Sequence, residues 1–159
     1  MVVTKPLAKL FFLLRESYNS LLMKLKIELY KSKGVKIGKN FKFSKDSYLD
    51  LHNPSLIEIG DNVQLTKWAM ILCYDSAKNK EPFKQIMNTS PYGKVKIGSN
   101  VYIGAHSVIM PNVCIGDNVI VAANSVVTKD IGPNCIVAGT PARVLREFEI
   151  NELQFDRIQ

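Results

Sequence analysis

From Ile97 to Gly132 the apolar and polar residues recur every six positions, in six consecutive repeats. The first position of each repeat is aliphatic, and the fifth is small or β-branched. The first positions are Ile97, Ile103, Ile109, Ile115, Val121 and Val127, and the fifth are Val101, Ser107, Val113, Val119, Ser125 and Ile131. A period of six fits neither a helix stripe nor a half-buried strand, but it suits short strands joined at corners and stacked in a solenoid. The pattern therefore predicts an all-β solenoid in which one repeat forms one side of a coil.

Two further columns of the repeat predict where the chain bends. The second position holds small residues, where a bulky side chain would crowd the bend: Gly98, Gly104, Gly116 and Ala122. The fourth position reads Asn100, His106, Asn112, Asn118, Asn124 and Asp130. Asn, Asp and His are the non-glycine residues that most readily adopt a positive φ. Each repeat is therefore expected to turn at its fourth residue.

A less regular form of the repeat continues toward the N-terminus, with Ile37 and Ile59 each followed by glycine. Residues 50–58 shift its phase once. The polar stretch 75–94 interrupts it for longer and is expected to leave the solenoid as a loop, and long loops in repeat proteins usually line a binding surface. We place the solenoid at residues 34–143, with the protruding loop at 75–94.

Both ends of the chain space their apolar residues as helices do. Residues 1–33 are predicted to form one or two amphipathic helices, and residues 144–159 a short C-terminal helix. The first segment carries seven Lys or Arg against two Glu, and so holds most of the net charge of +7. Two interpretations stay open: a helix that caps the solenoid or packs on a neighbouring subunit, or a peripheral membrane contact between the cations and anionic lipid. No nucleic-acid motif accompanies the basic residues, so nucleic acid is not an expected partner.

Length and cysteine content indicate one cytoplasmic domain. A chain of 159 residues with 47% hydrophobic residues can form one continuous core. Cys73, Cys114 and Cys135 lie in aliphatic contexts without CxxC spacing, which predicts reduced, mostly buried thiols. Neither a run of about 18 apolar residues nor a cleavable small-residue site is present, so we expect no spanning helix and no secretory signal.

Three strings of residues within 95–146 resemble a known family. The string from Ile103 to Asn118 is similar to the repeated side of the hexapeptide-repeat acyltransferases, and residues 125–131 and 137–144 resemble that family's closing signature. The resemblance implies a left-handed parallel β-helix, a homotrimer, and acetyl-CoA lying between adjacent solenoids. It also implies an acceptor hydroxyl or amine on a sugar or related molecule. The N-terminal helix and the mid-chain loop are similar to those of bacterial O-acetyltransferases of surface polysaccharide and lipopolysaccharide assembly.

Carried over residue by residue, the resemblance assigns two parts of an acetyl-CoA site. Small side chains that permit close approach would flank the pantetheine arm: Gly104, Ala105, Ala122 and Ala123. Thr128, Lys129 and Arg143 would face the nucleotide, because the phosphates of CoA need fixed cations. The alternative is that Lys129 and Arg143 are solvated corner charges. Trp68, also at a corner position, would stack on the acceptor sugar or on adenine, or serve packing alone.

The predicted catalytic residues depart from the family pattern. These enzymes usually carry a His-Asp pair just before the loop, with the His as general base, whereas this chain reads Tyr74-Asp75. A free phenol has a pKa near 10 against about 6.5 for imidazole, so ionising it at neutral pH costs roughly 4 kcal/mol. Three possibilities stay open: an activated or positioning Tyr74, a base supplied elsewhere, or a protein that has lost efficient transfer. Asp75 would orient the acceptor or accept a proton weakly, or it only caps the loop.

The chain has two histidines, so the choice of a replacement base is narrow. His106 is the better candidate, although it also fits the corner column, and His52 is interpreted as a surface-loop residue. With three repeats per coil, as the family implies, His106 stacks above Trp68, while Tyr74 lies below Asn112 at another corner. We therefore expect His106 to reach the Tyr74-Asp75 segment only from a neighbouring subunit.

The resemblance thus implies an acetyl-CoA-dependent O-acetyltransferase acting on a bacterial cell-surface sugar. Two rival functions remain. One is a non-catalytic scaffold or CoA-binding protein, which the tyrosine at position 74 suggests. The other is a metal-dependent hydratase of the same fold, such as the trimeric carbonic anhydrases, which need three histidine ligands. The two histidines occupy unsuitable repeats, so we expect no metal site.

Overall fold

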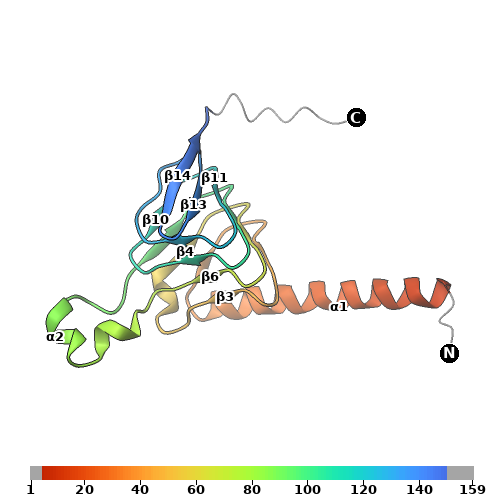
Figure 1. Ribbon diagram of the computed structural model, residues 1–159. Coiled ribbons are helices and arrows are strands. Elements are labelled where there is room, and N and C mark those ends of the chain that lie inside the picture. Colours follow the sequence, from red (N-terminus) through yellow and green to blue (C-terminus); the bar gives the residue numbers. More distant parts are fainter. Residues whose placement is uncertain (1–4, 150–159) are drawn as a thin grey trace.

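The computed structural model describes residues 5–149, which form a three-sided prism of short strands with a long helix leaving its base (Figure 1). Face A contains β1 (Lys36–Ile37), β4 (Ile57–Ile59), β7 (Val95–Ile97) and β10 (Cys114–Ile115). Face B contains β2 (Lys42–Phe43), β5 (Gln64–Leu65), β8 (Tyr102–Ile103), β11 (Val119–Val121), β13 (Cys135–Gly139) and β14 (Ala142–Glu147). Face C contains β3 (Tyr48–Leu49), β6 (Met70–Ile71), β9 (Val108–Ile109) and β12 (Val126–Val127).

Stacking of the repeats forms the core of the prism. Apart from the terminal strand β14, strands on a face pair in parallel. From β7 to β12 the partners are 18 positions apart, as in Ile103 with Val121 and Ile109 with Val127. Three six-residue repeats therefore complete one coil. The first-position side chains point inward and are at most 5% exposed. The predicted solenoid of stacked apolar columns is confirmed.

Corners form where the fourth column predicted them, with one exception. Asn100, His106, Asn112, Asn118 and Asn124 all have φ between 57° and 63°. Asp130 does not, although Asn134, at the following corner, has φ 58°. The last coil is shorter: Asn118 bonds to Asn134, 16 residues on, whereas Asn100 bonds to Asn118, 18 residues on. The prediction of a turn at Asp130 is therefore wrong, because two residues fewer complete this coil.

Corner AB, where the chain passes from face A to face B, is built from an asparagine ladder. Each side-chain Nδ2 donates to the Oδ1 of the next asparagine at 2.8–3.0 Å, through Asn40, Asn62, Asn100, Asn118 and Asn134. The amides thus satisfy one another along the corner. This corner is occupied by structural hydrogen bonds, which leaves corner BC (face B to face C) and corner CA (face C to face A) as places for chemistry.

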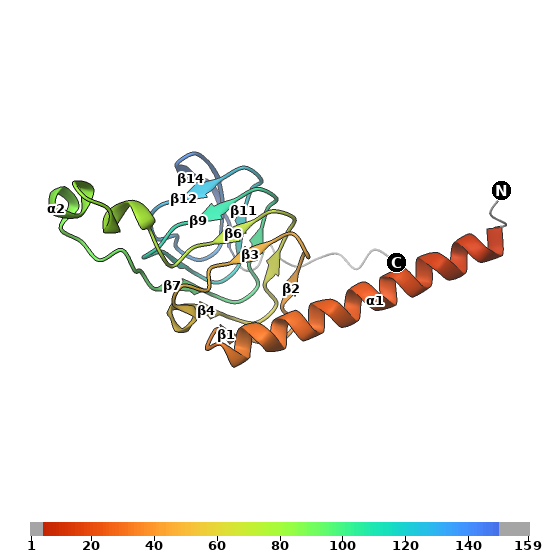
Figure 2. The same ribbon diagram turned by 90° about the horizontal axis from the view of Figure 1, so that it is seen from below.

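A single helix, α1 (Lys5–Ser32), covers residues predicted to hold one or two. Its last turns pack on the prism: Tyr30 is buried against Phe43, and Met23 and Ile27 are partly buried on the core. The rest of α1 extends away from the coils (Figures 1 and 2). More than half of each of its outer apolar side chains is exposed, namely Leu10, Phe12, Leu13, Leu14, Tyr18, Leu21, Leu25 and Leu29. Within residues 5–149 no helix has the length and hydropathy needed to cross a bilayer.

At the other end the chain forms a strand where a helix was predicted from residue 144. After Gly139, at φ 103°, the chain reverses and β14 pairs antiparallel with β13. The outer side of β13 has unpaired backbone groups, and a strand can satisfy them whereas a helix cannot. The helix prediction is therefore wrong for Val144 to Glu147; residues 150–159 lie outside the described part of the chain.

The loop at residues 75–94 projects from corner CA, on the side of the prism opposite α1 (Figures 1 and 2). It contains the 3₁₀-helix η2 (Ser76–Asn79) and the short helix α2 (Phe83–Met87). An antiparallel bridge between Tyr74 and Tyr92 closes its base. A second 3₁₀-helix, η1 (Pro54–Leu56), lies in the coil below. The loop thus stands over the residues of corner CA.

All three cysteines are free thiols, but they differ in exposure. Cys73 and Cys135 are buried, as expected, whereas Cys114 is exposed. Cys114 follows the buried Val113, so its side chain points outward from face A by strand alternation. The prediction of mostly buried thiols is therefore confirmed, with Cys114 as the exposed one.

Candidate functional site

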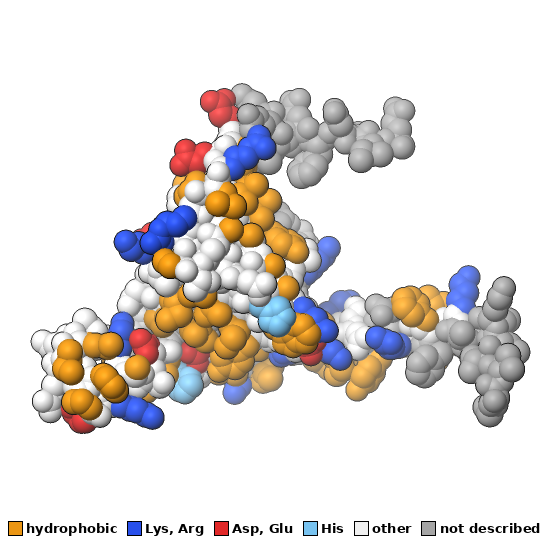
Figure 3. All heavy atoms as spheres, in the orientation of Figure 1, with side chains coloured by type: hydrophobic (Ala, Val, Ile, Leu, Met, Phe, Trp, Pro, Cys, Tyr) orange, Lys and Arg blue, Asp and Glu red, His pale blue; other side chains and the backbone are white. Residues whose placement is uncertain are grey.

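The two histidines lie at different corners of the prism, and Figure 3 shows them as separate pale-blue patches. His106 is at corner BC, where its ring lies 4.5 Å from the Trp68 ring and its backbone N–H donates to the Lys67 carbonyl at 3.1 Å. The predicted stacking of His106 above Trp68 is confirmed. The Lys67 ammonium lies 4.1 Å from the centre of the indole, so one face of Trp68 already carries a cation–π contact.

Tyr74 is at corner CA, at the start of the loop. Its ring is stacked on His52, with centroids 4.6 Å apart and planes inclined by 20°, and it lies 5.0 Å from the Tyr92 ring. Its phenol oxygen accepts a 3.4 Å hydrogen bond from Asn79 Nδ2. Tyr74 and His106 therefore belong to separate clusters within one chain, as the count of repeats predicted.

Asp75 begins the loop as a helix cap. Its Oδ1 accepts the Ala77 backbone N–H at 3.1 Å, and its own N–H donates to the Pro91 carbonyl at 2.8 Å. These bonds hold the first turn of η2 and the closing end of the loop. These contacts correspond to the capping role of Asp75, one of the alternatives that the sequence left open; the other was to orient the acceptor or accept a proton.

Beneath Tyr74 lies an Asp-His pair that the sequence interpretation missed. The His52 Nδ1 and the Asp50 Oδ1 are 2.6 Å apart, and Asp50 Oδ1 also accepts the His52 backbone N–H at 3.0 Å. Asp50 Oδ2 accepts the Cys73 N–H at 3.1 Å. The Asp50 side chain is 3% exposed and that of His52 is 57% exposed. A buried carboxylate therefore fixes an accessible imidazole.

Burial and hydrogen bonding act in opposite directions on Asp50. Burial by itself raises the pKa of the Asp50 carboxyl, but the donors of His52 and the Cys73 N–H together lower that pKa below its ordinary value. The carboxylate is thus ionised at neutral pH although it is buried. Its two oxygens link the coil at His52 to the next coil at Cys73.

One sequence signal could have found this pair. Asp50 and His52 are two residues apart directly after β3, and a carboxylate with this spacing can accept both the backbone and the ring N–H of the histidine. The adjacent Asn53 and Pro54 favoured a surface loop instead. The contact of His52 with Tyr74 follows from coil stacking and cannot be read from local sequence.

The residues assigned to acetyl-CoA by resemblance divide between two corners. Gly104, Ala105, Ala122 and Ala123 are at corner BC, where the backbone N–H of Gly104 donates to the Val121 carbonyl. Thr128 and Lys129 are exposed at corner CA, and Arg143 is exposed on β14. Arg143 Nη1 donates to the Ala142 carbonyl at 2.8 Å. Lys129 forms no ion pair within the part of the chain that the structure describes.

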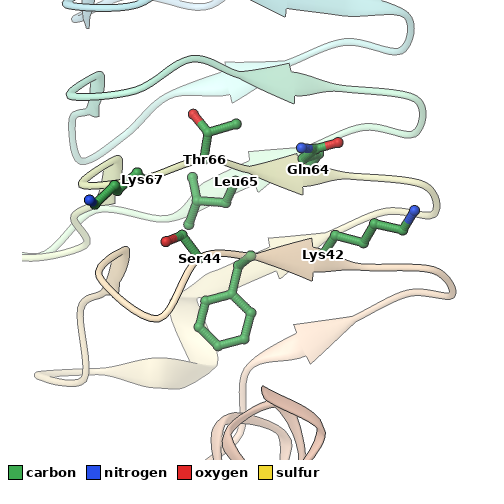
Figure 4. Close-up of a pocket in the computed structure, with 7 residues that line it drawn as sticks. Lys42, Ser44, Gln64, Leu65, Thr66 and Lys67 are labelled. Atoms are coloured by element: carbon green, nitrogen blue, oxygen red, sulfur yellow. The ribbon is translucent and has the colours of Figure 1, made fainter. Parts of the chain in front are cut away.

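Two surface depressions of the single chain lie away from the candidate catalytic residues. Figure 4 shows one on face B beside α1, lined by Lys42, Phe43, Ser44, Gln64, Leu65, Thr66 and Lys67. A second lies on face A around β10. Neither includes Tyr74, His52 or His106. Residues 5–149 bring together no three His, Cys, Asp or Glu side chains able to hold a metal ion.

Comparisons with known proteins agree on the fold. Residues 94–129 match the family model described as bacterial transferase hexapeptide (six repeats). Over 122 residues the chain is 39% identical to Protein CapG of Staphylococcus aureus, a match that covers 75% of this chain and 69% of CapG.

Two solved acetyltransferases are similar in structure. A maltose O-acetyltransferase from Clostridium difficile 630 is 38% identical with a TM-score of 0.59, over 73% of this chain and 60% of that one. A galactoside acetyltransferase in complex with coenzyme A is 30% identical with a TM-score of 0.57, over 77% of this chain and 60% of that one. The chain thus spans less than two thirds of either. The fold is the left-handed parallel β-helix that the resemblance implied.

Proposed function

The chain belongs to the hexapeptide-repeat bacterial transferases, and from that premise we propose that it is an acetyl-CoA-dependent O-acetyltransferase. The proposed acceptor is a sugar of a bacterial cell-surface polysaccharide or lipopolysaccharide. The observation that carries the proposal is 38% identity to a maltose O-acetyltransferase over 73% of the chain, with the fold retained. The complex of a galactoside acetyltransferase with coenzyme A supports the choice of acyl donor.

The exposed residues at corners BC and CA fit such a donor. Ala123 is exposed and carries only a methyl group, so an extended pantetheine arm can approach the backbone there. Lys129 and Arg143 are exposed cations suited to phosphate groups. The bound donor would supply an activated acetyl thioester. The chain would supply small-residue walls, cations and hydrogen-bond donors.

The division of these residues between two corners supports a homotrimer. Five residues separate Ala123 from Thr128, at most about 17 Å at 3.3 Å per residue, because the chain turns at Asn124. Two corners of one prism form a single groove only when corner BC of one subunit lies against corner CA of the next. We therefore propose that acetyl-CoA binds between adjacent solenoids of a trimer, where His106 of one subunit faces the loop of another.

The exposed apolar side chains of α1 need a partner in this proposal. We propose that they pack between subunits of the trimer; peripheral contact with a membrane is the alternative, because the same helix carries lysines. Co-sedimentation with vesicles rich in anionic lipid separates the two: binding would support the membrane, whereas recovery in the supernatant would support packing. Three free thiols support a reducing, cytoplasmic location.

The reaction is direct acetyl transfer. The acceptor hydroxyl would lose its proton to a base while its oxygen attacks the thioester carbonyl. Backbone N–H groups at the corners would stabilise the developing negative charge on the carbonyl oxygen. Binding both substrates in one groove would supply proximity.

A second candidate function is a CoA-binding protein with impaired catalysis, and Tyr74 at the family's histidine position favours it. One assay separates the two. Thiol release from acetyl-CoA is measured with a panel of nucleotide-linked and lipid-linked sugars for the parent, Tyr74→His, Tyr74→Phe and His106→Asn. Sugar-dependent release by the parent supports the transferase. If the parent binds CoA but releases no thiol, and Tyr74→His gains sugar-dependent thiol release, the result supports a CoA-binding protein with impaired catalysis.

A further inference from the structure

Corner CA contains the pair Asp50 and His52, to which the sequence analysis gave no chemical role. Asp50 is buried and ionised, its Oδ1 lies 2.6 Å from His52 Nδ1, and the ring of His52 is stacked on Tyr74. Two backbone N–H groups, of His52 and Cys73, hold the carboxylate in place. The imidazole is therefore fixed in position and in orientation from both its edge and its face.

This arrangement has the properties of an oriented base. A carboxylate at Nδ1 stabilises the tautomer with the proton on Nδ1, which leaves Nε2 with a free lone pair. Within residues 5–149 no group forms a hydrogen bond with His52 Nε2. The His52 side chain is 57% exposed, so an acceptor can approach it. A histidine that only served packing would not need a buried charge behind it.

The position of the pair along corner CA suits transfer from a CoA thioester whose phosphates would lie at Lys129. Leu49, Ile71, Ile109 and Val127 are stacked partners on face C, so Asp50 and Thr128 follow equivalent positions three coils apart. Three strand spacings of about 4.8 Å separate the two ends by roughly 14 Å. The cation proposed to contact the CoA phosphates thus lies at one end of the corner, and an oriented imidazole lies at the other.

We propose that His52, held by Asp50, is the general base of acetyl transfer in this chain. The inference rests on the proposed function and names the residue that replaces the family's histidine. His52 Nε2 takes the proton of the acceptor hydroxyl as that oxygen bonds to the acetyl carbonyl carbon. The C–S bond then breaks with its electron pair leaving on sulfur, and the imidazolium returns the proton to the thiolate. Acetyl-CoA and a sugar hydroxyl thus become an acetyl ester and CoA, and His52 is regenerated.

The neighbouring aromatic rings indicate what the base acts on. Tyr74 lies against His52, and Tyr92, which is 42% exposed, continues the aromatic surface under the loop. A pyranose ring offers apolar C–H faces that suit an exposed tyrosine ring, with its hydroxyls at the rim. The constellation therefore fits a sugar whose reacting hydroxyl points toward His52.

The first test compares acetyl transfer by the parent, His52→Asn and His106→Asn. Loss of a general base typically slows turnover by about 10²–10⁴-fold, and we expect a loss of this size in kcat for His52→Asn, with CoA affinity unchanged. The loss for His106→Asn should be at least about tenfold smaller. If the parent transfers acetyl and the kcat of His52→Asn is within about tenfold of the parent's, the role of His52 is wrong while the proposed function stands. A parent that transfers to no sugar would overturn the proposed function.

The second test asks whether Asp50 positions His52 or only supports the fold. Because the chain has two histidines, ¹⁵N spectra of histidine-labelled protein contain two imidazoles, and His106→Asn assigns them. The parent should show His52 protonated at Nδ1 when neutral. Asp50→Asn should shift His52 toward the other tautomer and lower kcat while leaving KM for acetyl-CoA unchanged. An unchanged tautomer in Asp50→Asn, or a His52 with its neutral proton on Nε2 in the parent, would contradict the assignment.

Discussion

Replacing Gly104 with alanine tests the close stacking of coils at corner BC. A Cβ at residue 104 would lie 2.5 Å from the Ala123 nitrogen and 2.7 Å from the Ala122 carbonyl carbon. Ordinary contact begins near 3.4 Å, so the two coils must separate by about 1 Å. The Gly104 N–H to Val121 carbonyl bond, 2.8 Å long, stretches with them.

The expected loss in the free energy of unfolding of Gly104→Ala combines two effects. Overpacking typically costs about 1–3 kcal/mol, and a weakened backbone hydrogen bond contributes about 1 kcal/mol within that range. Gly132→Ala is the matched control, because a Cβ at residue 132 meets nothing within 4 Å in the described part of the chain. Removing a glycine at an unstrained position is neutral or stabilises by up to about 1 kcal/mol.

Thermal unfolding followed by far-UV circular dichroism measures both variants at one protein concentration. For a chain of this size each kcal/mol moves Tm by about 2–4 °C, so Gly104→Ala should melt several degrees below Gly132→Ala. Equal melting temperatures would refute the close approach of the coils, and with it the register that pairs Ile103 with Val121.

Three further predictions concern the thiols, one acidic residue and the core. Burial raises the pKa of Cys73 and Cys135, whereas Cys114 is exposed, so a thiol reagent should modify Cys114 alone in the native chain; rapid reaction of two thiols would contradict this. Hydrogen bonds from two lysines lower the pKa of Glu58 from 4.5 to about 2. Ionised Glu58 therefore stabilises the fold fully above pH 4.5, and this contribution is lost as the pH falls toward about 2. The Tm deficit of Glu58→Gln should therefore shrink on acidification through that range, and a constant deficit would disprove it. Ile109→Ala, at a fully buried position, should cost about 2–5 kcal/mol in chemical unfolding, and a loss below 1 kcal/mol would show that the column is not packed.

Much of the fold follows from local sequence because residues at the same position of the repeat stack on one another in successive coils. Ile103 and Val121 stack since a coil contains three repeats, and Asn118 turns since its side chain tolerates a positive φ. The strand β14 could not be read in this way. Its apolar spacing suits a helix, but the unpaired outer side of β13 selects a strand, which is an effect of tertiary structure.

The candidate site was predictable only in part. Counting repeats placed Tyr74 and His106 at different corners, which the structure confirms. His52 was interpreted as a loop residue, because nothing local shows that Asp50 is buried or that the next coil brings Tyr74 onto the imidazole. Contacts between residues 22 positions apart depend on where the phase breaks fall, and residues 50–58 contain such a break.

Acetyl transfer to a sugar is best tested by detecting the acetylated sugar itself. Purified protein is incubated with acetyl-CoA and the sugar panel, and the sugars are analysed by mass spectrometry. We predict that one class of sugar gains a single base-labile acetyl group with the parent, and that His52→Asn forms this product at least about 100-fold more slowly. If every sugar in the panel stays unmodified while the protein is folded and binds CoA, the chain is not a sugar O-acetyltransferase.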